Sequence, residues 1–478
     1  MGQEITSTQF KKSDFDAFAR RLKQETELLA DWFAGKLFEN KQFVAGFELE
    51  AWLIHHNYLP SPCNEAYLAR VNNPLVTPEL AKFNVELNGN PQSLQQHGLR
   101  KLHDELENTW ALCNDTAKQL DAQLAMIGIL PTVNKKDLTL DNMSDMKRYR
   151  ALNEQVLRLR KGKPLNLDIK GHQHLKTEHR DVMLESAATS LQIHLQVPVD
   201  QAMRYHNAAQ ILSGPMVASS ANSPFLFGHQ LWDETRIPLF EQAVEVGGFD
   251  GAAYGPMKRV CFGSDYVRQS LMECFTENIE HYPILLPILF DEDPSELCHL
   301  RLHNGTIWRW NRPLIGFDYD GMPHLRIENR VVPGGPTVVD VIANAAFFFG
   351  IMQTLMTTEI PPEKQLSFSA ARDNFYATAR HGLDAHIDWF GEKRGTARTL
   401  ILDELLPMAK QGLEALEIDT ADINRYLEII RMRVETAQNG AAWQRAYVEK
   451  HGRDLAAMTN AYRQRQESGK PVHEWDLL

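Results

Sequence analysis

The sequence predicts an α+β protein in which a mostly antiparallel sheet is flanked by helices. Several separate segments alternate apolar and polar residues, which is typical of strands with one buried face. Longer segments between them repeat apolar residues at helical spacing, and strands in the middle of the chain are adjacent in sequence. The chain of 478 residues is long enough for two or three domains, or for one large core with attached layers.

The first elements alternate between helix and strand. Residues 14–37 carry apolar side chains at helical spacing and predict an amphipathic helix. "GFELEAWLI" (46–54) and "KFNVELNG" (82–89) alternate and predict strands. A helical pattern from 94 to about 126 stops at "GILP", and residues 131–146 are typical of a loop.

The middle of the chain predicts one further helix before the next strand. "MKRYRALNEQVLRLR" predicts this helix, and "KGKP" ends it. "KGHQHLKTEHRD" (170–181) is polar throughout and predicts a mobile loop that could act as a lid. "TSLQIHLQV" (189–197) is the cleanest alternation in the chain and predicts a strand, followed by a helix over 200–220.

The remaining segments complete the expected sheet and add helices. "ANSPFLFGHQLWDETRIPLFEQA" reads as a loop leading into a helix. Residues 300–317 predict a hairpin or two short strands, and 324–336 predict a strand ended by Pro-Gly-Gly-Pro. From 338 onward the pattern is helical almost to the end. The apolar stretch 338–356 contains Asp340 and Asn344, which favours a buried core helix over a membrane span.

Composition excludes several functional classes. The net charge of -12 and the lack of a Lys/Arg block argue against binding to nucleic acid or to an anionic membrane. The five cysteines are scattered without a CxxC pair, and no apolar leader is present, so we expect a cytoplasmic protein. The chain lacks the GxGxxG, GxxxxGK[ST], HExxH and GxSxG motifs of common nucleotide-binding and hydrolytic enzymes.

Four predicted strands share an unusual polar face. Side chains two residues apart point to the same side of a strand, and here they are Glu, Gln, His, Asn and Arg without lysine. Carboxylate oxygens and imidazole nitrogens are ligands for Mg²⁺ or Mn²⁺, and arginine binds phosphate. The pattern therefore favours phosphoryl transfer from a metal-bound nucleotide over an ordinary solvated face. The residues are Glu48 and Glu50; Asn84, Glu86 and Asn88; Gln192, His194 and Gln196; Arg326, Glu328 and Arg330.

These strands resemble the motifs of the glutamate–cysteine ligase family, within the glutamine synthetase-like carboxylate–amine ligases. "GFELEAWLI" resembles the family's Glu-x-Glu strand, "VELNGNPQSL" its second metal strand and "RYRALNEQ" its Arg-Tyr helix. "ATSLQIHLQV" is similar to its Thr-x-x-Gln-x-Asn/His strand, and "RIENRVVPGGP" to its Glu-x-Arg strand. "ANSPFLFG" followed by Arg236 resembles its Ala-Asn-Ser-Pro-Phe loop and downstream arginine.

The resemblance implies a curved sheet that forms a funnel for ATP and two or three Mg²⁺ ions, with Mn²⁺ as an alternative metal. It implies that ATP phosphorylates a carboxylate, usually the γ-carboxylate of glutamate, and that an amine then forms an amide, as in glutathione biosynthesis. Cysteine is the default amine. It divides the chain into an N-terminal helix (1–40), a catalytic domain (41–360) and a helical C-terminal region (361–478) whose role stays open, including a role in forming a homodimer. The segments "NRVVPGGP" and "HNGTIWRWNRP" depart from the family pattern, which leaves the amine open.

The resemblance also implies roles for individual residues. Glu50 and Glu86 would hold one metal ion, with Glu79 as a third ligand. A second ion would be held by Glu48, Glu328 and either Gln192 or His194, and the sequence does not choose between the last two. Arg330 would contact the transferring phosphoryl group, and Arg236 the substrate carboxylate or phosphate. Gln192, Arg309 and Lys258 are candidates for nucleotide binding.

Structural alternatives exist for several of these residues. Glu79 could begin a helical turn, where an acidic side chain is favoured, and His194 could be a hydrogen-bonded core histidine. Arg309 and Arg312 could stack on Trp308 and Trp310. Lys258 could be a surface charge. Two other functions stay open: ligation to a different amine, and a nucleotide-binding regulatory protein that has lost turnover.

Overall fold

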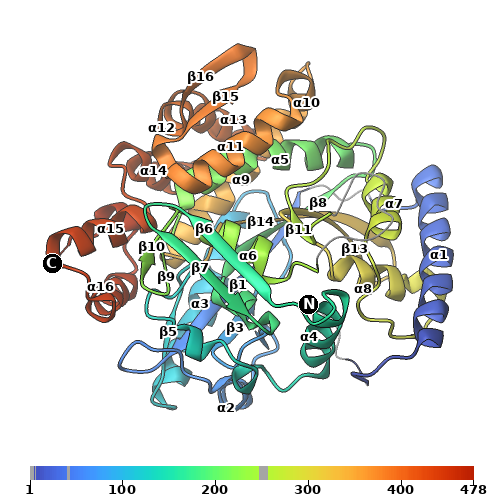
Figure 1. Cartoon of the computed structure of the whole chain (residues 1–478). Coiled ribbons are helices and arrows are strands. Elements are labelled where there is room, and N and C mark those ends of the chain that lie inside the picture. The colour runs from blue at the N-terminus through green and yellow to red at the C-terminus, as the bar shows by residue number, and fades with distance from the viewer. Residues whose placement is uncertain (1–4, 6, 40–42, 247–256, 478) are drawn as a thin grey trace.

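An antiparallel sheet lies at the centre of the computed structural model, which describes residues 5, 7–39, 43–246 and 257–477. Within these residues its strand order is β13-β14-β8-β1-β3-β2, and β4 and β5 both pair with β1 (Figure 1). The strands are β1 (Val44–Ile54), β2 (Val76–Pro78), β3 (Asn84–Asn88), β4 (Gln92–Ser93), β5 (Gln123–Ala125), β8 (Ser190–Val197), β13 (Asn311–Phe317) and β14 (Pro323–Pro333).

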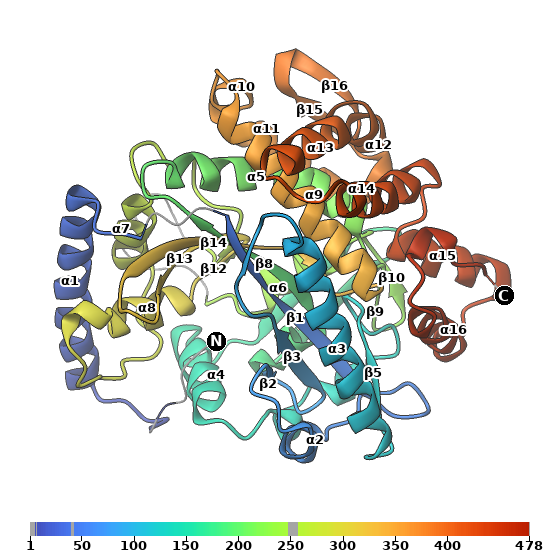
Figure 2. The ribbon, with the colours of Figure 1, turned by 180° about the vertical axis from the view of Figure 1, so that it is seen from behind.

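Helices cover one face of this sheet because alternate side chains of its strands are apolar. Phe47 and Leu49 of β1 and Ile193 of β8 are buried on that side. The face is packed by α3 (Gly98–Lys118), α5 (Ala202–Ser220) and α9 (Val338–Thr357), as Figure 2 shows from behind. Helix α9 is apolar enough to span a membrane, but 94% of its apolar window is buried inside the protein. The expectation of a core helix is therefore confirmed.

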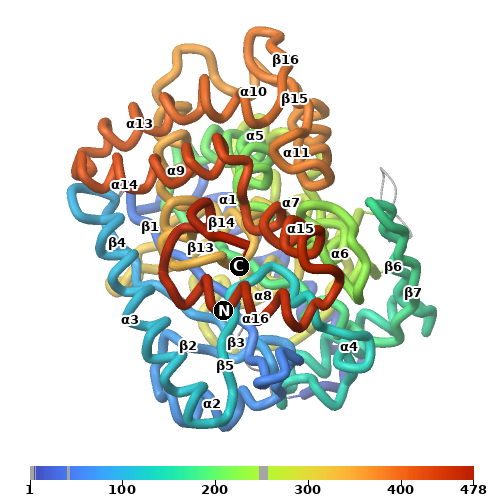
Figure 3. The backbone as a smooth tube through the Cα atoms, turned by 90° about the vertical axis from the view of Figure 1, so that its left-hand side faces the viewer, coloured from blue at the N-terminus to red at the C-terminus, as the bar shows by residue number. Residues whose placement is uncertain are grey.

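The C-terminal helices add a second layer behind the first. Helix α11 packs on α5, and α13 and α14 pack on α9. Helices α15 and α16 pack on each other and lie in front of the sheet in Figure 3, and Tyr462 of α16 donates a hydrogen bond to the carbonyl of Met126. The bounds are α10 (Pro362–Gln365), α11 (Phe368–His381), α12 (Ala397–Leu400), α13 (Leu406–Ala415), α14 (Thr420–Glu435), α15 (Gly440–His451) and α16 (Leu455–Glu467).

The other face of the sheet carries the polar side chains. Further helices and short strands complete the fold. These are α1 (Lys12–Gly35), α2 (Asn64–Val71), α4 (Lys147–Leu159), α6 (Arg236–Ala243), α7 (Met272–His281), α8 (Cys298–Gly305), the short helix η3 (Val182–Ala187), the hairpin of β6 (Leu165–Lys170) and β7 (His174–His179), the hairpin of β9 (Phe225–Leu226) and β10 (His229–Gln230), and the pair of β11 (Val260–Cys261) and β12 (Trp308–Arg309).

Three sequence expectations about these elements are wrong. Residues 170–181 form most of the β6–β7 hairpin rather than a mobile loop, because Leu175, Thr177 and His179 are buried while the intervening residues face solvent. The first part of 300–317 is helix α8 rather than a strand, because His299, Leu300 and His303 form a buried helical face. The C-terminal region also contains a hairpin of β15 (His386–Trp389) and β16 (Lys393–Thr396).

A buried hydrogen-bonded pair of side chains fixes the N-terminal helix to the rest of the protein. Glu25 of α1 and His299 of α8 are both 2% exposed, and His299 Nδ1 bonds to Glu25 Oε1. The second carboxylate oxygen of Glu25 accepts a hydrogen bond of 2.8 Å from the backbone N–H of Leu300. His299 Nε2 accepts from the N–H of Phe290, so Nδ1 carries the proton donated to Glu25.

We therefore expect Glu25→Ala to destabilise the protein by about 2–4 kcal/mol, because it leaves two buried donors without an acceptor. Glu27→Ala, on the exposed side of the same helix, should change stability by less than about 0.5 kcal/mol. Urea unfolding of both variants measures the difference. Equal effects would show that the Glu25 contact does not anchor α1.

Candidate active site

The strand register places the polar side chains in rows across one face of the sheet. One row joins Thr77, Glu86 and Glu50, and it continues to Ser190, whose backbone N–H donates to Glu50 Oε2 at 2.7 Å. A second row joins Asn88, Glu48 and Gln192. A third joins Gly46, His194, Glu328 and Arg312. The alternation in four strands thus becomes a single continuous face.

Three carboxylates meet at the β1–β3 side of this face. Glu50, Glu79 and Glu86 each offer an oxygen within 4.8 Å of the others. Glu79 follows β2 directly and begins no helix, so it does not occupy the first turn of a helix as the structural alternative proposed. Thr77 Oγ1 and Asn88 Nδ2 each donate to Glu86 Oε1 at 3.1 Å and fix that carboxylate.

The protonation of these carboxylates reflects their crowding. Burial, with the neighbouring Glu86, raises the pKa of Glu50 to about 7. Burial, with Glu50 and Glu185, raises the pKa of Glu79 to about 8. Burial and the charges of Glu48 and Glu79 raise the pKa of Glu86 well above its ordinary value. Like charges at this distance favour a proton or a metal ion between them.

His194 lies between two further carboxylates. Its Nε2 is 3.5 Å from Glu48 Oε1, and it pairs across the strands with Glu328. Burial lowers the pKa of His194 to about 4, so the imidazole is neutral at pH 7. Neither ring nitrogen has a hydrogen-bond partner among the described residues, although the side chain is buried. A satisfied core histidine would have such a partner, so this alternative is wrong.

Gln192 and Arg330 connect the two halves of the face. Gln192 Nε2 donates to Glu50 Oε1 at 3.1 Å, and its Oε1 accepts from Arg330 Nη2 at 2.8 Å. Both ends of the Gln192 amide are therefore occupied, in contrast to His194. Arg330 also bonds to Glu328, through Nε at 2.7 Å. This geometry favours Gln192 as a positioning group and His194 as the metal ligand of the pair.

Arginines dominate the β14–β13 side. Arg312 Nη2 lies 2.8 Å from Glu328 Oε2. Burial alone would raise the pKa of Glu328, but the guanidinium groups of Arg312 and Arg330 hold it well below its ordinary value. The face is therefore divided, with carboxyl groups of raised pKa toward β3 and guanidinium groups toward β13.

Arg236, at the start of α6, supports Arg330 through the backbone. Between Asn329 and Val332 the pairing of β14 with β8 shifts, so two residues of β14 bulge opposite Gln192. Arg236 donates to the carbonyls of both bulged residues, Arg330 (3.1 Å) and Val331, and to Glu234 at 3.1 Å. Arg236 is 1% exposed. These contacts indicate that it shapes the bulge that carries Arg330.

Two candidate residues lie away from this face. Arg309 of β12 donates to Asn278 Oδ1 at 2.7 Å, pairs with Glu277 and packs over the ring of Tyr282. Lys258 lines a separate cavity of about 980 Å³. The alternative in which Arg309 and Arg312 stack on tryptophans is wrong, because Arg309 packs over Tyr282, Arg312 pairs with Glu328, and the guanidinium 5.4 Å from the Trp310 ring is that of Arg236.

The structure adds residues that the strand pattern did not reveal. Glu185, on η3, has a pKa raised to about 8 by burial and by Glu50. Arg148, at the start of α4, interacts electrostatically with Glu79 and Glu86 and opposes the rise in the pKa of Glu79. Its Nη2 donates to Tyr149 Oη at 2.6 Å. The "RYRALNEQ" motif contains Arg148, but nothing local in sequence marks Glu185.

The residues on the acidic side fit divalent cations. Three carboxylates with raised pKa values lie within 4.8 Å of one another, and an imidazole without a hydrogen-bond partner among the described residues adjoins Glu48. Oxygen ligands with one nitrogen suit Mg²⁺ or Mn²⁺. The Glu328 carboxylate is already neutralised by two arginines, so its ligation would require those guanidinium groups to turn toward another anion.

Comparison with known proteins relates this geometry to a family. A family model described as glutamate–cysteine ligase family 2 matches residues 44–468. The chain belongs to this family. Membership confirms the expected resemblance and makes the protein a carboxylate–amine ligase. No curated protein sequence matches the chain.

Solved structures of glutathione-related ligases share the fold of this family member. The glutamate–cysteine ligase of Francisella tularensis, in complex with AMP, has a TM-score of 0.53 at 12% identity, covering 92% of this chain and 91% of that one. The bifunctional glutathione synthetase of Pasteurella multocida has a TM-score of 0.54 at 10% identity, covering 93% of this chain and 55% of that one. At such identities the similarity shows the fold, which confirms the predicted α+β class.

The raised carboxylate pKa values predict how stability depends on pH. A folded-state pKa above the unfolded value means that the folded cluster holds protons more tightly, so its stability contribution falls as pH rises from about 5 through 7 and 8. In EDTA, thermal unfolding should shift to lower temperature over this range. Mg²⁺ should raise the melting temperature more at pH 8 than at pH 6.

The variant Glu86→Gln should reduce both effects, because it removes one of the three crowded carboxylates. Glu65→Gln, an exposed position on α2, should leave both curves unchanged. A Glu86→Gln protein with the wild-type pH slope and Mg²⁺ response would contradict the assignment of this cluster.

Proposed function

We propose that this family member is an ATP-dependent ligase that joins the γ-carboxylate of glutamate to an amine, with cysteine as the first amine to test. The observation that carries this proposal is the divided sheet face, with crowded carboxylates on one side and guanidinium groups on the other. Metal-bound phosphates and a substrate carboxylate need these two environments side by side. Family membership supports the same reaction class.

The proposed reaction has two steps. A carboxylate oxygen of glutamate attacks the γ-phosphorus of ATP, so that ADP leaves and an acyl phosphate forms. The amine nitrogen then attacks the acyl carbon and releases a proton, the C–O bond breaks, and inorganic phosphate leaves with the amide formed. Activation is needed because a free carboxylate is a poor electrophile, whereas phosphate is a good leaving group.

The carboxylates would hold the divalent cations in two groups, Glu50, Glu79 and Glu86, and Glu48, His194 and Glu328. When bound there, such cations neutralise phosphate oxygens of the nucleotide. Gln192 fixes the positions of the Glu50 and Arg330 side chains through its two hydrogen bonds. Arg330 lies between the two groups, where its guanidinium would meet the charge that develops on the transferring phosphoryl group.

Arg236 would position Arg330 through hydrogen bonds to the backbone of β14, rather than contact the substrate. Its donors bind the Arg330 and Val331 carbonyls and Glu234, which leaves the guanidinium committed to the protein. Arg309 is likewise committed to Glu277 and Asn278. We therefore assign the direct substrate contact to Arg330 and, with Arg312 as its neighbour, to the β14–β13 side.

Turnover of purified protein tests the proposal. ADP formation with ATP and Mg²⁺ should require both glutamate and an amine, and a panel led by cysteine should identify the acceptor. Glu50→Gln should reduce the rate by at least about 100-fold, because it removes a ligand and the partner of Gln192. Glu65→Gln serves as the matched control. Nucleotide binding without turnover under any mixture would instead support a regulatory protein on this fold.

The choice between His194 and Gln192 has its own test. His194→Ala should raise the Mg²⁺ concentration needed for half-maximal rate by about 10–100-fold, with partial recovery at high Mg²⁺. Gln192→Ala should lower kcat without such a shift, because it releases Arg330 rather than a metal ion. The reverse pattern, with the Mg²⁺ requirement shifted only in Gln192→Ala, would exchange the two roles.

A further inference from the structure

A basic pocket lies between one loop and two β-hairpins, away from the carboxylate face. It has a volume of about 640 Å³, within the range of small-molecule sites. None of its lining residues belongs to the carboxylate face. It is lined by Asn134, Lys135 and Lys136 from the loop after β5, by His174, Leu175 and Lys176 of β7, and by Phe227 and His229 of the β9–β10 hairpin.

The pocket concentrates positive charge on a protein whose net charge is -12. Among the described residues, no carboxylate lies within ion-pair distance of the three lysines that line the pocket, Lys135, Lys136 and Lys176. No Asp or Glu lines the pocket either. Asp168, directly across the hairpin from Lys176, lies 2.8 Å from His174 instead. Three exposed lysines around one cavity, with no carboxylate partner, favour an anionic ligand, and lysine is a common phosphate-binding residue.

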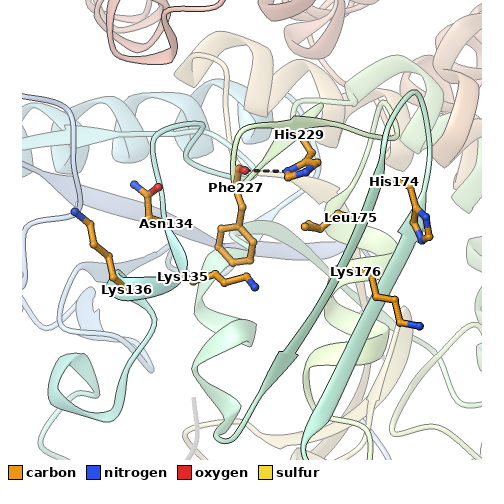
Figure 4. A pocket seen from close by; sticks show the side chains of 8 residues that line it. All are labelled: Asn134, Lys135, Lys136, His174, Leu175, Lys176, Phe227 and His229. Carbon is orange, nitrogen blue, oxygen red and sulfur yellow. Dashed lines mark hydrogen bonds between the residues drawn. The ribbon is translucent and has the colours of Figure 1, made fainter.

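Phe227 occupies the middle of the pocket in an unfavourable backbone conformation. Figure 4 shows its ring above the Lys135 side chain, with Asn134 and Lys136 farther out on one side and Leu175 and Lys176 on the other. Phe227 and Gly228 form a two-residue turn with φ of 47° and 74°. Such a turn favours Asn-Gly, and positive φ is strained for a bulky side chain. A Phe in this strained position suggests that its ring has a function.

We propose that this pocket binds a nucleoside polyphosphate without a metal ion, at a site separate from the sheet face. The lysines would bind the phosphates, and the Phe227 ring would stack on the base. The opposite ring face of Phe227 is supported by His179, whose ring is stacked at 6.0 Å. The inference does not depend on the ligase reaction, because it concerns binding in the absence of turnover.

Calorimetric titration of the full chain with ADP in EDTA tests this site. Without metal ions, the crowded carboxylates of the sheet face repel phosphate, so binding there is suppressed. We expect ADP to bind about tenfold more tightly than pyrophosphate, because pyrophosphate lacks the base. The double variant Lys135→Gln, Lys176→Gln should weaken ADP binding by at least about tenfold. Lys170→Gln, on the same hairpin but outside the pocket, should leave the affinity within about twofold.

The variant Phe227→Asn separates a binding role from a structural one. Asn suits the turn, so the melting temperature should not fall, whereas ADP affinity should drop to that of pyrophosphate. A lower melting temperature with unchanged ADP affinity would overturn the role given to Phe227. Absence of ADP binding in EDTA, binding unaffected by the lysine variants, or citrate binding as tightly as ADP would overturn the nucleotide site.

Discussion

The structure depends on holding several partly or fully buried carboxylates close together on one face of a sheet. Glu50, Glu79 and Glu86 repel one another, and folding the chain without a cation forces protons onto them at neutral pH. The free energy that opposes this repulsion comes from the opposite face, where apolar strand residues and the nearly all-apolar α9 are buried. A site of this kind therefore needs a large core behind it.

The same sheet keeps its acidic and basic sides apart. Glu328 and Glu50 lie on neighbouring parts of one face, yet Arg312 and Arg330 lower the pKa of Glu328 while burial and Glu86 raise that of Glu50. Environments that separate the pKa values of similar groups are typical of active sites. The β-bulge of β14 contributes to this separation, because it places the Arg330 side chain within hydrogen-bond distance of Gln192. Arg236 holds the bulge by donating to the Arg330 carbonyl.

Elements distant in sequence reinforce this arrangement. The C-terminal helices α13 and α14 pack on α9, and α16 contacts the backbone at Met126. The family match extends to residue 468, so these helices belong to the family's fold although they carry no recognisable motif. The fold by itself identifies no substrate. The choice of amine therefore rests on side chains around the face rather than on the sheet common to its relatives.

Alternation in the sequence determined the sheet face, because side chains two residues apart on a strand must share a side. Alternation alone therefore places Glu48, Glu50, Glu86, His194 and Glu328 on the polar sides of their strands. Alternation shows which side of its strand a side chain occupies, but not which residue each of its polar atoms hydrogen-bonds. Only the tertiary structure showed that the Gln192 amide is hydrogen-bonded at both ends, whereas neither ring nitrogen of His194 has a partner in the described part of the chain. It also showed that Arg236 binds backbone carbonyls and that Arg309 lies away from the carboxylate face. Glu185 was found beside Glu50 in the same way. These outcomes depend on strand order, on one bulge and on loops that return from distant parts of the chain, which local patterns do not encode.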